Sequence, residues 1–156
     1  MANAELERGL TAEAESLAAL VMAEYRHLRR ALGARDVDGA IAAATAMVLF
    51  ARMLQQVSRA VGDGGEDAPD LALAEDLLQP VAAVEEWSEK SESHTIVTNN
   101  IGPLEKFDMV RGVDQRFIFR HLDPDRMVFH HKGRTLALAD VVGWAERLAR
   151  HVAEAS

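Results

Sequence analysis

An uncharged run of thirteen residues, 39–51, lies inside a segment whose apolar residues recur at steps of three or four. This spacing predicts one α-helix over residues 37–61, with Asp36 as its N-cap and Gly62 as its stop. Two adjacent apolar rows widen its apolar face, which is typical of a helix contacted from more than one side. The rows are Met47, Phe50, Leu54, Val57 and Val61, and Ile41, Val48, Leu49 and Met53. We expect a buried central helix; a second hypothesis is that its second face mediates dimerisation.

Another apolar stripe runs along the N-terminal segment and predicts a helix over residues 4–32. Its members are Leu6, Leu10, Ala14, Leu17, Val21, Tyr25, Leu28 and Leu32. Gly33 is a natural residue to close this helix, and residues 33–35 are the only link to the central helix. Because so short a link makes neighbouring helices antiparallel, we expect an antiparallel pair.

Glycine, proline and acidic residues crowd residues 62–70, and this composition predicts a flexible loop. Apolar positions at helical spacing then predict a third helical region over residues 70–90. Pro80 lies inside that region and has no backbone N–H to donate. We therefore expect a kink, or a new helix that begins at Pro80.

The pattern changes after a polar linker at residues 88–94, and residues 116–132 predict a β-hairpin with its turn at 123–126. Pairing of Asp123 with Arg126 would place alternate residues on one face. That face holds Phe117, Phe119, His121, Val128 and His130, and the other holds Ile118, Arg120, Leu122, Met127, Phe129 and His131. The other expected elements are a strand at 95–98, a short helix at 103–110, a third strand at 134–138 and a last helix that begins near Asp140. One side of this last helix is expected to be apolar, with Trp144 beside a row formed by Leu138, Val141, Ala145, Leu148 and Val152.

These elements predict a mainly α fold of the α+β class. An antiparallel helical bundle is expected over residues 4–91, and a smaller unit over 95–155 contains the hairpin or three-stranded sheet and the final helix. Each part has few apolar residues for a core of its own. We therefore expect residues 1–156 to form a single domain, with the C-terminal helix and sheet packed on the helices.

The composition favours a cytoplasmic protein. The chain has 156 residues, 49% of them hydrophobic, and no cysteine, which excludes disulfides, thiolate catalysis and sulfur-ligated zinc. The first ten residues lack the basic and apolar regions of a signal peptide. The uncharged run at 39–51 is shorter than the roughly 20 apolar residues that cross a bilayer, so no membrane-spanning segment is expected.

Acidic residues concentrate at residues 62–92, where ten Asp and Glu against Lys90 alone give a net charge of −9. An acidic chain does not neutralise phosphates, so direct nucleic-acid binding is not expected. The segment could instead imitate phosphate charge and occupy a nucleic-acid-binding protein through Glu85, Glu86 and Glu89. The simpler interpretation is a solvated helix face with an acidic loop.

Histidines gather near the C-terminus, and the expected hairpin makes His121 and His130 diagonal neighbours on one face. With Asp123 or Asp125 they could bind a divalent metal through nitrogen and oxygen. No HExxH or HxH spacing accompanies them, and exposed histidines are common on hairpins. A small metal-dependent enzyme built on these two histidines is therefore a third hypothesis. It is less favoured than a protein-binding adaptor and than an acidic segment that imitates phosphate charge.

Basic and aromatic residues alternate in the same region, as Arg116, Phe117, Phe119 and Arg120 show. Such a surface can bind single-stranded nucleic acid by stacking. The favoured interpretation is that the phenylalanines belong to the core and the arginines are solvated or paired with aspartates. In an intramolecular variant, this basic unit docks on the acidic residues 62–92.

Phosphate-binding loops, nucleophile elbows and other catalytic signatures are absent from the sequence. Long amphipathic helices and segregated charge are present. Together they favour a non-enzymatic protein-binding, adaptor or regulatory protein, acting as a homodimer through helical surfaces, with another protein as partner and no cofactor. Tyr25 and Trp87 could anchor such an interface, because aromatic residues concentrate binding energy. They are equally suitable as core residues.

Overall fold

The computed structural model describes residues 2–62, 67–78 and 120–155. Four helices and a three-stranded antiparallel sheet form this part of the chain, which confirms the mainly α fold with a small β unit. In chain order the elements are α1 (Ala2–Gly33), α2 (Val37–Val61), α3 (Leu71–Leu78), β1 (Leu122–Asp123), β2 (Val128–His131), β3 (Arg134–Ala137) and α7 (Leu138–Ala155). The features expected at Pro80, 95–98 and 103–110 lie outside the described residues.

The predicted bounds of α2 are confirmed at both ends. Asp36 is its N-cap, and its side chain accepts a hydrogen bond of 3.0 Å from the backbone N–H of Gly39. A Cβ atom at position 39 would clash with the Asp36 carboxylate as it lies in this cap, so the carboxylate would have to shift for any residue other than glycine. In the link before α2, Gly33 is still the last residue of α1, and the left-handed residue is Arg35, with φ of 57°. The expectation that Gly33 lies beyond the helix was therefore wrong.

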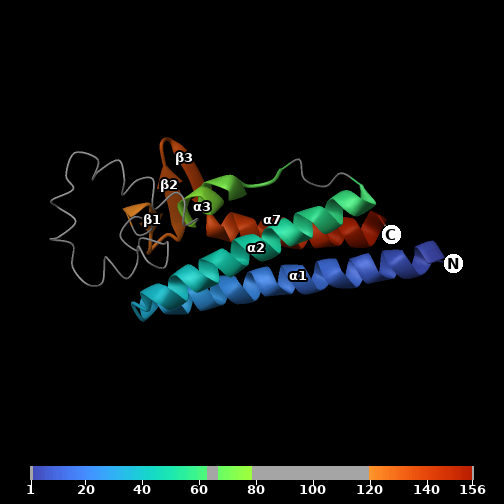
Figure 1. Cartoon of the computed structure of the whole chain (residues 1–156), viewed down its shortest axis with the longest axis horizontal. Coiled ribbons are helices and arrows are strands. Elements are labelled where there is room, and N and C mark those ends of the chain that lie inside the picture. The colour runs from blue at the N-terminus through green and yellow to red at the C-terminus, as the bar shows by residue number, and fades with distance from the viewer. Residues whose placement is uncertain (1, 63–66, 79–119, 156) are drawn as a thin grey trace, which may run out of the picture.

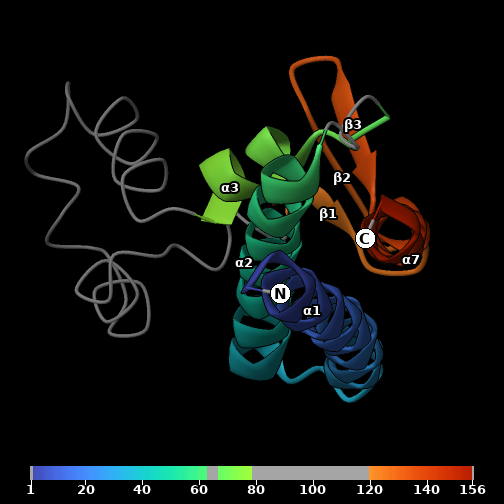
Figure 2. The same cartoon turned by 90° about the vertical axis from the view of Figure 1, so that its right-hand side faces the viewer.

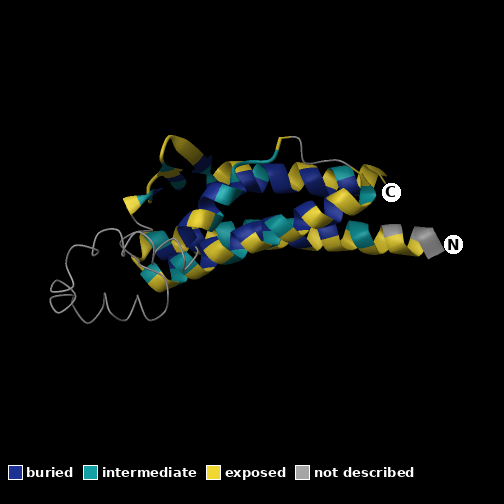
Figure 3. Ribbon diagram, turned by 45° about the horizontal axis from the view of Figure 1, so that its top comes forward, coloured by how far each residue is buried: buried dark blue, intermediate teal, exposed yellow. Residues whose placement is uncertain are grey.

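The three long helices lie side by side, with α1 antiparallel to both α2 and α7 (Figure 1). Seen end-on they form a triangle, and α3 and the sheet lie along α2 and α7 on the side away from α1 (Figure 2). Buried residues concentrate where the helices face one another (Figure 3). The largest fully buried side chains include Leu28, Met47, Leu54, Val141 and Leu148, which come from all three helices.

Residues of β1, β2 and β3 pair in sequence order, and Phe129 of β2 lies opposite Leu122 and Leu136. The predicted pairing of Asp123 with Arg126 was wrong, because Asp123 pairs with Val128 across a longer turn. Met127 was expected in the strand but ends this turn in the left-handed conformation. The displacement is two residues, an even number, so the residues of β1 and β2 keep their predicted faces, whereas His121 and Met127 lie outside these strands.

The final helix begins at Leu138, two positions before the expected start at Asp140. Its predicted apolar side is confirmed, since Leu138, Val141, Trp144, Ala145, Leu148 and Val152 are all buried. This side packs against α1 and α2. The C-terminal part of the chain therefore shares its core with the N-terminal helices.

Candidate functional site

A stripe of exposed residues runs along the whole length of α2, on the side turned away from the core. Its members, spaced three or four apart, are Asp38, Ala42, Thr45, Leu49, Met53, Gln56 and Ala60. Leu49 is 57% exposed and Met53 38%, although both are large apolar side chains. The half-buried Ile41, Ala46 and Phe50 flank the middle of the stripe. We call the apolar middle, residues Ala42, Thr45, Leu49 and Met53, the outward face of α2.

Thr45 belongs to this apolar surface despite its hydroxyl group. Its Oγ1 donates a hydrogen bond of 2.8 Å to the backbone carbonyl of Ile41, one turn earlier in α2. The hydroxyl is thus satisfied within the helix, and no charged residue occurs between positions 39 and 51. A partner covering the outward face would therefore desolvate few polar atoms, which lowers the cost of association.

The polar side chains of α2 next to this surface turn instead toward α3. Arg52 donates from Nε to Glu75 at 2.9 Å and from Nη1 to Gln55 at 2.9 Å. The hydrogen bond that Arg52 donates to Glu75, together with the negative charge of that carboxylate, raises the pKa of Arg52 above its usual value. This cluster holds α3 against α2 and neutralises the guanidinium closest to the outward face.

By length and composition alone, α2 could cross a membrane: it has 25 residues, and its most apolar window has a mean hydropathy of 1.6. The expectation that no segment is long enough was therefore wrong. The observation is weak evidence for a membrane span, since the core helix of a globular protein passes the same test. Only 39% of that window is buried, and the exposed remainder includes the outward face.

Ion pairs between β3 and α3 hold the sheet against the helices. Arg134 donates from Nε and Nη2 to the two carboxylate oxygens of Asp70, each at 2.7 Å, and its Nη1 lies 3.4 Å from Asp76. This is the intramolecular contact between the basic C-terminal unit and the acidic segment that the charge pattern suggested. Because Asp70, Glu75 and Asp76 have partners within the chain, they are less suited to imitate phosphates.

We expect Asp70→Asn to lower the free energy of unfolding near pH 7 and to make it less dependent on acid pH. The hydrogen bond from Arg134 holds the pKa of Asp70 below its usual value of 3.8. A lowered folded-state pKa contributes stability above the unfolded-state value, and this contribution is lost as the pH falls through the folded-state value. Since the pair is partly exposed, the variant should lose roughly 0.2–1 kcal/mol at pH 7.

Urea unfolding followed between pH 7 and pH 2 tests this prediction. The difference between wild type and Asp70→Asn should shrink as the pH falls below about 4, because Asp70 becomes neutral first in the unfolded chain and then, at its lower pKa, in the folded chain. Asparagine can still accept from the Leu73 N–H at the start of α3, so the helix cap is kept. Asp125→Asn on the exposed turn is the matched control. An equal pH dependence in both variants would contradict a stabilising ion pair between Asp70 and Arg134.

Two of the three hairpin histidines, His121 and His131, have their imidazole rings close together in a T-shaped arrangement. The ring centroids of His121 and His131 are 4.3 Å apart, and those of His121 and His130 are 6.4 Å apart. The backbone N–H of His130 donates to the carbonyl of His121, so the two residues lie opposite one another rather than diagonally. Nδ1 of His121 lies 3.1 Å from the carbonyl of His130, which can only accept, so this nitrogen is the donor.

Metal binding at these histidines gains no support from the geometry. Within 2–62, 67–78 and 120–155, no three or more His, Asp or Glu side chains are grouped so that they could hold a metal ion. The histidines line an open hollow with Arg120, Lys132 and the ion-paired Arg134, and the described residues of its lining include no carboxylate that could help to hold a cation. The His121–His130 metal site stays a prediction.

Some of the remaining candidate residues lie in the described part of the chain, and the others lie outside it. Tyr25 is half-buried and packs against the core, and Arg120 is exposed. Phe129, the one described phenylalanine of the hairpin, is fully buried in the core, as the favoured interpretation of the phenylalanines requires. The other candidates, Trp87, Glu85, Glu86, Glu89, Arg116, Phe117 and Phe119, lie outside the described residues.

Sequence reasoning placed Leu49 and Met53 in the second apolar row of the central helix and raised the hypothesis of dimerisation through that row. It did not assign Thr45 to this stripe, because the side chain of threonine is polar. The available signal was a spacing of seven residues, about two helical turns, which puts Thr45 on the same face as Asp38 and Leu49 on the same face as Ala42.

Comparison of the chain with models of protein families, with curated proteins and with solved structures finds no match. The functional assignment therefore rests on the residues of this chain.

Proposed function

We propose that this protein is a non-enzymatic protein-binding module of the adaptor or regulatory type, and that it acts in the cytoplasm as a homodimer. The observation that carries the proposal is the outward face of α2. This face is a continuous apolar helix surface on which Leu49 and Met53 stay in contact with water in the single chain. Exposing large apolar side chains in one continuous stripe is unfavourable unless a partner covers them.

A second copy of this chain fits the outward face by size. In an antiparallel pair with its two-fold axis at Leu49, residues at equal distances from Leu49 lie opposite one another. Thr45 then faces Met53 of the second copy, and Ala42 faces Gln56. Each small side chain meets a longer one, so the two helices can interdigitate and approach closely.

Charge along the stripe favours the same antiparallel arrangement. Asp38 lies at the N-terminal end of the stripe, and Arg59 lies near its C-terminal end. The antiparallel pair brings each Asp38 near Arg59 of the second copy, whereas a parallel pair would bring like charges together at both ends. The helix dipoles also oppose one another in the antiparallel arrangement, which is favourable.

Leu49→Arg tests this proposal most directly. At the two-fold axis each substitution places two guanidinium groups face to face, and such contacts cost several kcal/mol. We expect the dimer dissociation constant to rise by at least about 100-fold, measured by sedimentation equilibrium. Leu6→Arg is the matched control, since Leu6 is an exposed leucine near the N-terminus of α1, outside the proposed interface, and should leave the dimer unchanged.

Arg59→Glu separates the antiparallel pair from a parallel one. It places an acid near Asp38 of the second copy and should weaken an antiparallel dimer, while a parallel dimer would be little affected. A wild-type chain that stays monomeric at high micromolar concentration, or a dimer that survives Leu49→Arg, would refute the proposal.

A further inference from the structure

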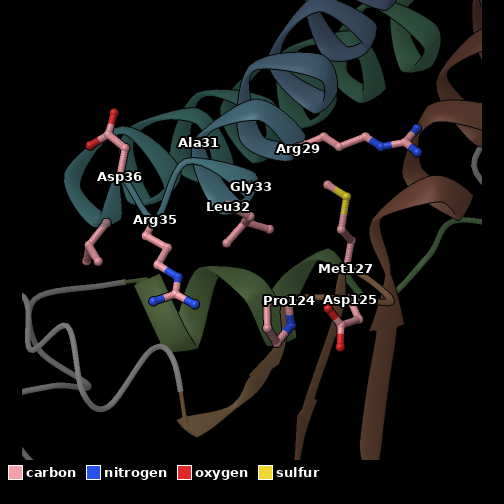
Figure 4. Close-up of a pocket in the computed structure, with 10 residues that line it drawn as sticks. Arg29, Ala31, Leu32, Gly33, Arg35, Asp36, Pro124, Asp125 and Met127 are labelled. Atoms are coloured by element: carbon pink, nitrogen blue, oxygen red, sulfur yellow. The ribbon is translucent and has the colours of Figure 1, made fainter.

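A cavity of about 550 Å³ lies between the link that joins α1 to α2 and the turn that joins β1 to β2 (Figure 4). Arg29, Leu32, Arg35 and Val37 line it on the helical side, and Pro124 and Met127 line it on the hairpin side. Its volume falls in the range of roughly 300–1,000 Å³ that is typical of small-molecule sites. It is separate from the outward face of α2, which starts more than a helical turn further along the chain.

We propose that this cavity binds a small organic acid, with an apolar body against the cavity walls and a carboxylate held by Arg29 or Arg35 at one end of the cavity. The apolar part of the site is formed by Leu32, which points into the open space, and by Met127 across from it (Figure 4). Val37 and Pro124 extend this surface. Such walls exclude inorganic phosphate as the preferred ligand, because a fully hydrated anion gains nothing from them.

The two guanidinium groups of the cavity have no partner within the described part of the chain, although Asp36 and Asp125 also line the cavity. Arg29 and Arg35 are both exposed, and neither guanidinium forms an ion pair or hydrogen bond with a described residue. The carboxylate of Asp36 is committed to the N-cap of α2 and points away from the cavity (Figure 4). The guanidinium groups of Arg29 and Arg35 lie on opposite sides of Leu32 (Figure 4), so a ligand with a single carboxylate pairs with one of them.

Backbone conformation marks the same place independently. Among the described residues, three non-glycine residues have positive φ, and two of these, Arg35 and Met127, line the cavity from opposite sides. A left-handed conformation is unfavourable for residues with a Cβ atom and is concentrated at functional sites. In both turns the strained residue also carries one of the side chains that the ligand would contact.

The arrangement predicts selectivity for the acid over its neutral analogue. The walls would accept the alkyl chain of decanoate and of decanol alike, because both chains are apolar. The arginine contacts are available to the carboxylate alone, and charge-assisted hydrogen bonds are about twice as strong as neutral ones.

The test is isothermal titration of the full-length protein with decanoate below its micelle concentration. We expect saturable binding of one decanoate per chain, and binding of decanol at least about tenfold weaker. One of the two substitutions Arg29→Gln and Arg35→Gln, at the arginine that holds the carboxylate, should weaken decanoate binding about tenfold. Arg30→Gln, with the same loss of charge on an exposed neighbour that does not line the cavity, should bind normally. Leu32→Trp should abolish binding by filling the cavity, with both arginines retained.

The proposal is overturned if decanoate does not bind up to its solubility limit, or if Arg30→Gln weakens binding as much as the more harmful of Arg29→Gln and Arg35→Gln. The second outcome would show general attraction to the basic end of α1. Circular dichroism of each variant ensures that lost binding is not lost folding. Because the dimer surface is separate, Leu49→Arg should bind decanoate normally, so failure of either proposal is distinguishable from failure of the other.

Discussion

Phe129→Ala is expected to lower the free energy of unfolding by about 3–5 kcal/mol, a large part of the stability of a typical domain. Phe129 is fully buried at the centre of the middle strand, between Leu122 and Leu136. The strands have only two to four residues each, so their backbone hydrogen bonds are few. Docking of the sheet on α3 and α7 therefore depends on this apolar cluster, and removal of the ring leaves a cavity at its centre.

Urea unfolding and hydrogen exchange test the expectation together. The midpoint of unfolding should fall, and the amides of β2 and β3 should lose protection before those of α1 and α2, because the helices keep their own contacts. Val128→Ala, on the other face of the same strand and half-buried, is the matched control and should cost less than about 1 kcal/mol. An equal effect of both substitutions would show that Phe129 is not the anchor of the sheet.

The sequence predicts elements best where neighbouring residues decide the structure. Both ends of α2 were predicted because the Asp36 cap and Gly62 lie next to the helix they bound. The buried side of α7 was predicted for a similar reason, since five of its residues repeat at helical spacing. The hairpin register failed where the local signal was ambiguous: proline at 124 fits a type I turn, but nothing nearby shows that Met127 extends the turn in a left-handed conformation.

Contacts between distant segments were less predictable. Arg134 and Asp70 are separated by 64 positions, and only the opposite charges of their segments suggested that they meet. The cavity joins the α1–α2 link to a turn some 90 positions later, and neither segment contains a recognisable binding motif. Arg35 and Met127 have ordinary sequence contexts, so their strained conformations and shared cavity become visible only when the tertiary structure is known.

Periodicity located the outward face of α2 but did not predict its exposure. Both apolar rows of the central helix have similar hydrophobicity, and the sequence does not show which neighbours cover each row. In the structure α1, α3 and α7 all contact α2, and together they bury Met47, Leu54 and Val57 of the first row. Leu49 and Met53 of the second row are left exposed. Exposure is decided by how many helices are available to pack, which is a property of the whole fold.

Leu54→Ala and Leu49→Ala are expected to change the stability of the monomer by very different amounts, although the residues lie on one helix, five positions apart. Leu54 is fully buried, so its truncation should lower the free energy of unfolding by about 2–5 kcal/mol. Leu49 is mostly exposed, and its truncation should change the stability of the monomer by less than about 0.5 kcal/mol. The change is the same in both variants, so differences in helix propensity cancel.

Chemical unfolding at several protein concentrations separates the two roles. Dissociation of a dimer makes apparent stability depend on concentration, and Leu49→Ala should reduce this dependence while Leu54→Ala retains it. If Leu49→Ala instead lowered stability equally at every concentration, Leu49 would be covered within its own chain and the outward face would not be a dimer surface. The pair of variants thus distinguishes two faces of α2. One face packs in the core of the monomer, and the other is the outward face, which we propose as the dimer interface.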